Sequence, residues 1–319
     1  MSPIESGRES KRSGEKNTNT TSTPYSQNFE QNLIDHRIYP PWHYGNGGEN
    51  RPDNLREIKQ RLAVRRPSLS QPNIDAEYEK FMTKYSNART ESQVMGSVIP
   101  FIEGNTSQYA GGGSLFNNLA PLTDGAVSMA KPDTYYGARP EQLKREIRND
   151  LSDKIIPSKK DSSPMAPNFF TEVKSEAGRP IVARRQACYN GALGARAIHA
   201  LQSYDPSTPH RPPVYDNNAY TVSSTYLDGQ LRLFTSHPRR PSQPGSSPGY
   251  SMTELGSYSM TNDPEAFRTG ATAYRNARDW AQEKRDEMIA LANGRFSKAP
   301  RAQSENALPP LEEAKKEDI

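Results

Sequence analysis

The stretch that most constrains the fold is "AYTVSSTYLDGQLRLFTSHP", residues 219–238. Apolar side chains recur at alternate positions on both sides of Asp228-Gly229, a pair that favours a two-residue hairpin turn. The alternating residues are Tyr220, Val222, Tyr226, Leu231 and Leu233. The chain must therefore contain an antiparallel pair of strands, and so a sheet.

Helical patterns alternate with further strand patterns along the rest of the chain. We expect one helix, or two interrupted near Asn87, over residues 75–104, where apolar residues recur at helical spacing. Short strands are expected at 126–140, broken by Gly137, and at 167–176. Further helices are expected after Pro140, over 184–204, and over 262–295, where Asp263 serves as the N-cap. This order predicts an α/β (α+β) fold with a mixed central sheet flanked by helices.

Composition limits how much of the chain can form a core. Only 33% of the residues are hydrophobic and the mean hydropathy is −0.92, so long polar extensions are expected around one folded domain. We expect a disordered tail at 1–28, a docking arm at 29–74, the domain at 75–295, and a second disordered tail at 296–319. The net charge of +4 is compatible with a nucleic-acid partner but too small to indicate one.

Several classes of protein are disfavoured by single features. One cysteine, Cys188, allows neither an intramolecular disulfide nor a cysteine zinc site. No apolar run is long enough for a membrane span or a signal peptide. The glycines of "YAGGGSLFNN" match neither a phosphate loop nor a dinucleotide fingerprint, so no small-molecule organic cofactor is expected. We therefore expect an intracellular protein, nuclear or cytoplasmic and not secreted, with no membrane partner.

The strand pattern "PNFFTEVKSE", residues 167–176, carries the most chemical information. Glu172 and Lys174 are two residues apart, so on a strand their side chains point to the same face. A carboxylate can bind Mg²⁺, which usually takes one or two protein carboxylates together with waters and substrate phosphate oxygens. A lysine beside it can orient an attacking water or stabilise charge on a phosphate. The alternative is a cross-strand ion pair on a half-exposed sheet.

Two more carboxylates could complete such a site. Asp133 follows Pro132 at one end of the short strand before this one, where its side chain can stand free of the strand ladder. Glu91 is placed by helical phase about one turn from Val94, near the buried side of its helix. Together with Glu172 and Lys174, these two residues give a candidate site of four residues.

Pro132-Asp133 followed by Glu172-Val173-Lys174 resembles the PD-(D/E)XK nuclease superfamily, which has the restriction-endonuclease-like fold. The stretches "APNFFTEVK", "RRQACYNGALGARAIHALQSY" and "FRTGATAYRNARDWA" also look like a group of fungal proteins that carry this nuclease-like domain. The resemblance covers roughly residues 75–295. It implies a mixed sheet between helices, with the Asp and the Glu-x-Lys motif on adjacent strands.

The resemblance also implies roles for individual residues. Asp133, Glu172 and Lys174 would be catalytic, and Glu91, Asp133 and Glu172 would hold Mg²⁺ or Mn²⁺. Residues on the helix after the motif would contact nucleic acid. They are Arg184, Arg185, Gln186 and Tyr189, although the Gln186-to-Tyr189 step is shorter than the four residues expected in exonuclease-like branches.

Two functions remain open from the sequence. One is a Mg²⁺-dependent nuclease that hydrolyses phosphodiester bonds of nucleic acid. The other is a catalytically inactive nuclease-fold module that binds a protein or nucleic-acid partner, because a fold does not by itself give an activity.

Overall fold

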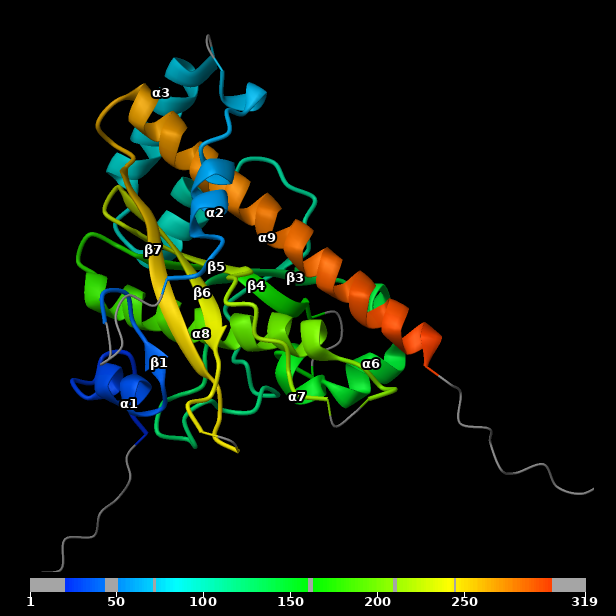
Figure 1. Ribbon diagram of the computed structural model, residues 1–319. Helices are drawn as coiled ribbons and strands as arrows, with labels where there is room; N and C mark the ends of the chain where they lie inside the picture. The colour runs from blue at the N-terminus through cyan, green and yellow to red at the C-terminus, as the bar shows by residue number, and fades with distance from the viewer. Residues whose placement is uncertain are drawn as a thin grey trace, which may run out of the picture.

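A computed structural model describes most of the chain (Figure 1). The described residues are 21–43, 51–70, 73–159, 163–208, 211–243 and 245–299. The expectation of disorder at 1–20 and 300–319 lies outside these ranges. Residues 21–28 differ from the expected disordered tail, because Ser22 is buried and pairs with Val127 in an isolated parallel bridge.

The centre of the fold is a seven-stranded mixed sheet in the order β1-β7-β6-β5-β4-β3-β2. Its strands are β1 (Ile38–Tyr39), β2 (Ala110–Gly111), β3 (Thr134–Ala138), β4 (Met165–Lys174), β5 (Thr221–Leu227), β6 (Gln230–Arg239) and β7 (Gly249–Ser259). The β4–β5 and β1–β7 pairs are parallel, and the other four pairs are antiparallel. The prediction of a mixed sheet is therefore confirmed.

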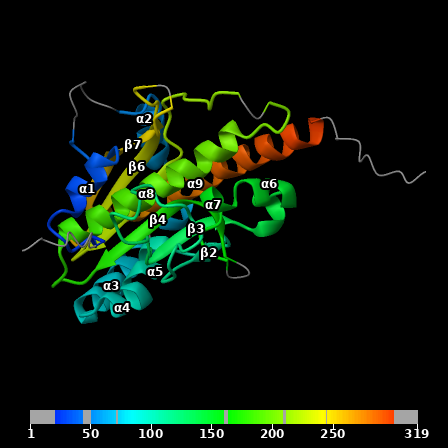
Figure 2. The ribbon, with the colours of Figure 1, turned by 90° about the horizontal axis from the view of Figure 1, so that it is seen from below.

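Helices lie on both faces of this sheet, and the two longest have the strands between them in Figure 1. These two are α8 (Pro180–Ser203) and α9 (Pro264–Lys298). The shorter segments are α1 (Phe29–Asp35), α2 (Leu55–Leu62), η1 (Pro67–Leu69), α3 (Asn73–Asn87), α4 (Glu91–Gln93), η2 (Val94–Val98), α5 (Ile99–Glu103), η3 (Pro140–Gln142), α6 (Arg145–Asp150) and α7 (Ser152–Ile155). Helices α6 and α7 lie where the C-terminal halves of α8 and α9 meet (Figure 2).

Side chains along β4 point alternately to the α8 face and the α9 face of the sheet. Phe169 packs edge-on against Tyr274 of α9, whereas Phe170 belongs to a cluster with Ala187 and Leu193 of α8. All ten residues of β4 are buried, as expected for a central strand covered on both faces. Polar side chains on β4 consequently need partners within the protein.

Local signals account for several elements. The β5–β6 hairpin closes through Asp228 (φ 46°) and Gly229 (φ 73°), the positive φ values of a two-residue primed turn. The predicted N-cap of α9 is also present, because Asp263 Oδ1 accepts a hydrogen bond from the Ala266 N–H at 2.7 Å. Strand β7 was not predicted. Nor does Gly137 break β3, which continues through a register shift to Ala138.

Candidate functional site

Glu172 is the most unusual residue of the fold because its carboxyl group is completely buried in the sheet. Its Oε1 accepts a hydrogen bond of 2.6 Å from the side-chain amide of Asn190 on α8. Its Oε2 is buried and has no hydrogen-bond partner within the described residues. A buried carboxyl oxygen without a partner is costly, so this position favours a proton or a cation.

Asp133 lies beside Glu172 because of strand register. Thr134 of β3 pairs with Thr171 of β4, and one further antiparallel step brings Asp133 next to Glu172. Asp133 Oδ2 accepts a hydrogen bond of 2.8 Å from the backbone N–H of Val173, the residue that directly follows Glu172. This bond fixes the second carboxylate at the end of β4.

Lys174 and Glu91 complete the cluster. The Lys174 ammonium is 3.5 Å from Glu91 Oε2 and donates to the Val173 carbonyl at 2.9 Å. Glu91 is in the first turn of α4, whose N-cap Thr90 forms a capping box with Gln93. The Lys174 side chain is 4% exposed and that of Glu91 is 45% exposed, so the cluster opens to solvent on the Glu91 side.

The electrostatics of the cluster act mainly on Glu172. Burial raises the pKa of this carboxyl well above its ordinary value, and the negative charges of Asp133 and Glu91 raise it further. The Lys174 ammonium and the Asn190 hydrogen bond lower it. The strand register and the Lys174–Glu91 ion pair place all four predicted residues around the end of β4.

The predicted nucleic-acid contacts are placed differently. Arg185 Nη1 donates to the carbonyls of Pro24 (3.1 Å) and Ser26 (2.8 Å), and Glu30 Oε2 lies 3.5 Å from its Nε. The same Glu30 oxygen is 3.7 Å from Arg184, whose guanidinium stands 5.8 Å from the centre of the Trp42 ring. Both arginines therefore hold the N-terminal segment 21–43 against α8.

The other two predicted contacts on α8 are not free surface groups either. Tyr189 is buried in the hydrophobic cluster around α8 and contacts Leu122 and Thr123. Gln186 is half-buried, and its Oε1 has no hydrogen-bond partner within the described residues. Cys188 is buried, and burial raises the pKa of its thiol to about 12.

Asn190 is the residue that sequence reasoning missed. It is four residues after Gln186, on the same face of α8, and it is the side chain of that helix that reaches the motif carboxyl. The signal that could have identified it is this spacing, because a side chain one turn beyond Gln186 must face the same strand. An asparagine among small residues gives no other indication of its role.

Two carboxylates of the cluster could hold Mg²⁺, that of the buried Glu172 and that of the half-buried Asp133. Glu172 offers a partnerless oxygen and Asp133 a neighbouring carboxylate, and Mg²⁺ requires only one or two such ligands. No group of three or more His, Cys, Asp or Glu side chains within the described ranges is arranged to hold a metal ion. Any ion here would therefore complete its shell with waters or substrate oxygens.

Comparison with known proteins identifies no similar protein. No family model matches the sequence, and neither the curated proteins nor the solved structures compared with it give a match. No helix in the described part of the chain is long and apolar enough to span a membrane. The fold is a mixed α/β domain, and the site is the buried Glu172 carboxyl and Lys174 ammonium beside the half-buried Asp133 and Glu91.

Proposed function

We propose that the chain is a Mg²⁺-dependent nuclease whose site is the Glu172 cluster. The observation that carries this proposal is the buried, partnerless Oε2 of Glu172 beside the Asp133 carboxylate and the Lys174 ammonium. The order of elements supports it: Asp133 directly precedes β3, Glu172-x-Lys174 is on the adjacent antiparallel strand β4, and α8 and then β5, parallel to β4, follow. That order is the one implied by the resemblance to the PD-(D/E)XK superfamily.

Each residue of the Glu172 cluster has its own role in the proposed reaction. Asp133 and Glu172 would hold the ion, which supplies charge neutralisation and a more acidic water when it is bound. Lys174 would orient the attacking water and stabilise the negative charge that develops on the phosphate. Glu91 keeps the ammonium at the cluster through its ion pair with Lys174, so its role is positioning. Asn190 orients the Glu172 carboxyl through Oε1.

The test is cleavage of single- and double-stranded DNA and RNA by the purified chain with Mg²⁺ or Mn²⁺. Lys174→Ala is expected to lower the rate by about 10²–10³-fold, the usual cost of losing one preorganised electrostatic group. Lys80→Ala is the matched control, because Lys80 is an exposed residue of α3 paired only with Glu77 in its own helix. An unchanged rate in Lys174→Ala would exclude this mechanism.

Metal binding can be measured without activity. Mg²⁺ should raise the thermal unfolding temperature of the unaltered chain, because a ligand that binds only the folded state stabilises it. Glu172→Gln should remove this rise. Metal-dependent stabilisation without cleavage of any substrate would instead favour the inactive nuclease-fold module.

A further inference from the structure

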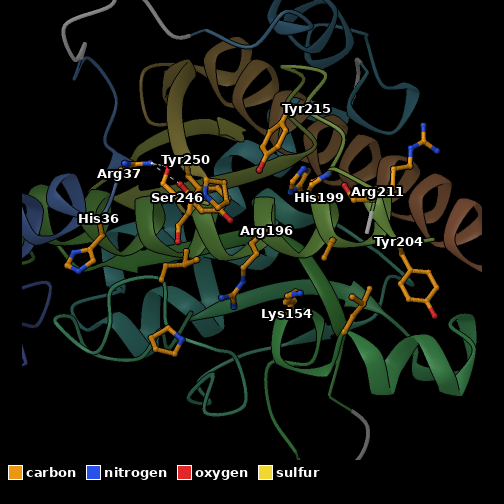
Figure 3. A pocket seen from close by; sticks show the side chains of 18 of the residues that line it. His36, Arg37, Lys154, Arg196, His199, Tyr204, Arg211, Tyr215, Ser246 and Tyr250 are labelled. Atoms are coloured by element: carbon orange, nitrogen blue, oxygen red, sulfur yellow. Dashed lines mark hydrogen bonds between the residues drawn. The ribbon is translucent and has the colours of Figure 1, made fainter. Parts of the chain in front are cut away.

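A cavity lies against the C-terminal half of α8 (Figure 3). Its volume is about 820 Å³, within the range of about 300–1,000 Å³ typical of small-molecule sites. Segments that are far apart in the sequence build it. They are residues 35–37, 121–124, 151–154, 196–205, Thr208, 211–215 and 246–250.

The C-terminal half of α8 provides one wall of this cavity. Arg196, His199 and Ser203 recur at spacings of three and four residues, which places them on one helical face. Asn190, which contacts Glu172, is six residues before Arg196, or about 9 Å along the helix axis. The cavity and the Glu172 cluster therefore share a helix but no lining residue.

Arg196 is the feature that most indicates a ligand. It is only 9% exposed, yet its guanidinium bonds to neutral backbone carbonyls, with Nη1 2.6 Å from the Ala120 oxygen and Nη2 3.4 Å from that of Asp153. Its Nε is buried without a partner in the described part of the chain. Burial lowers the pKa of this guanidinium, and electrostatic interactions with Tyr250, Tyr189 and Asp153 oppose this effect.

The other charged lining groups differ in their exposure and partners. Lys154 and Arg211 are exposed, and Arg37 donates to Ser246 Oγ and the Ser247 carbonyl at 3.1 Å.

The acidic lining residues are Asp35, Asp124 and Asp205, and the His36 ring is 4.0 Å from the Asp124 carboxylate. Asp124 has a side chain that is 99% exposed, Asp35 accepts from Gln31, and Asp205 accepts from the Ser207 N–H. The carboxylates are thus at the solvent side, whereas the buried charge is positive.

Aromatic side chains line the rest of the cavity wall. Tyr204, Tyr215 and Tyr250 line the cavity, and the Tyr215 ring is 4.6 Å from the His199 ring, centre to centre. His199 Nε2 is 2.7 Å from the Val214 carbonyl, which can only accept, so this nitrogen carries the proton. Burial lowers the pKa of His199, and the neutral ring leaves Nδ1 as an acceptor. These groups suit a planar heterocycle with donor atoms.

We propose that this cavity binds a nucleoside monophosphate, with the phosphate directed to Arg196 and Lys154 and the base beside His199 and Tyr250. An anionic group would compensate the buried guanidinium, and charge-assisted bonds to phosphate are among the stronger hydrogen bonds in proteins. Aromatic walls accept the face of any base, because every base has one. The site stands independently of the proposed nuclease activity.

The experiment is calorimetric titration of the full chain with AMP, GMP, adenosine and inorganic phosphate. We expect AMP or GMP to bind at least tenfold more tightly than adenosine or phosphate. Absence of binding by either nucleotide at millimolar concentration would overturn the proposal. Phosphate affinity equal to that of the nucleotides would also overturn it, because the ring would then contribute nothing.

Variants locate the binding. Arg196→Met should weaken nucleotide binding more than tenfold, and Lys154→Ala, at an exposed position that should not affect folding, severalfold. Arg145→Ala on the exposed face of α6 is the control and should bind normally. Lys174→Ala should also bind normally, which separates this cavity from the nuclease proposal. The assignment would be overturned if Lys154→Ala and a folded Arg196→Met both bound the nucleotide with unchanged affinity.

Discussion

At the scale of the residue, the site depends on one carboxyl group that is kept away from water. Glu172 has a single hydrogen bond, from Asn190, and two negative neighbours, Asp133 and Glu91. Lys174 compensates this charge only in part, because its ammonium is also bound by Glu91 and the Val173 carbonyl. Without a cation, burial and these two negative neighbours keep the pKa of Glu172 well above its ordinary value.

Stability should therefore depend on pH through Glu172. The unfolded chain releases the proton near the ordinary pKa of about 4.3, whereas the folded chain retains it to a higher pH. Between these two values the folded state binds more protons, so the free energy of unfolding falls as pH rises. Glu172→Gln should remove this fall and be more stable than the unaltered chain at pH 7 without metal, by about 1–3 kcal/mol.

Urea unfolding at pH 4 and pH 7 measures this difference. The two proteins should be similar in stability at pH 4, where the carboxyl is protonated in both states, and should diverge towards pH 7. Equal stabilities at both pH values would show that Glu172 ionises without cost. Adding Mg²⁺ at pH 7 should reduce the gap, since only the carboxylate can bind the ion.

At the scale of the element, local chemistry decides what can be predicted. The hairpin turn at Asp228-Gly229 and the Asp263 cap are specified by adjacent residues, and both are present. Strand β7 escaped prediction because it follows a Pro/Ser-rich loop and its pairing shifts register opposite Leu233 and Phe234. Strands β1 and β2 have two residues each, too few for any alternation to be recognised.

The same limit applies to the candidate site. Glu172 and Lys174 could be paired from their spacing along one strand. The approach of Asp133 depends on the β3–β4 register, a contact across 39 positions of sequence that no local pattern specifies. The contacts of Arg184 and Arg185 depend on where segment 21–43 folds back, which is equally non-local.

The N-terminal segment supplies a prediction at this scale. Its attachment combines buried Phe29 and Leu33 with the bonds from Arg185 to backbone carbonyls. Arg185→Ala should cost about 1.5–3 kcal/mol, the usual range for hydrogen bonds to a charged group. Urea unfolding gives the free energy, and Arg145→Ala serves as the control. A loss no larger than the control's would mean that apolar contacts alone hold the segment.

At the scale of the whole molecule, one sheet joins two hydrophobic layers. Strand β4 has neighbours on both edges, pairing with β3 and β5, and its side chains enter the α8 layer and the α9 layer in turn. Both proposed sites also use α8, the cluster through Asn190 and the cavity through Arg196. Neither layer can separate from the sheet without exposing the apolar face of β4 that it covers.

We therefore expect the two layers to unfold together. Phe169→Ala and Phe170→Ala remove neighbouring rings on opposite faces of β4, and each should cost about 3–5 kcal/mol. Each variant should still unfold in a single transition, with the same midpoint by circular dichroism and by fluorescence of Trp280, buried in α9, after Trp42→Phe removes the other tryptophan. Separate midpoints in Phe170→Ala would mean that the α8 layer can open while the α9 layer stays folded.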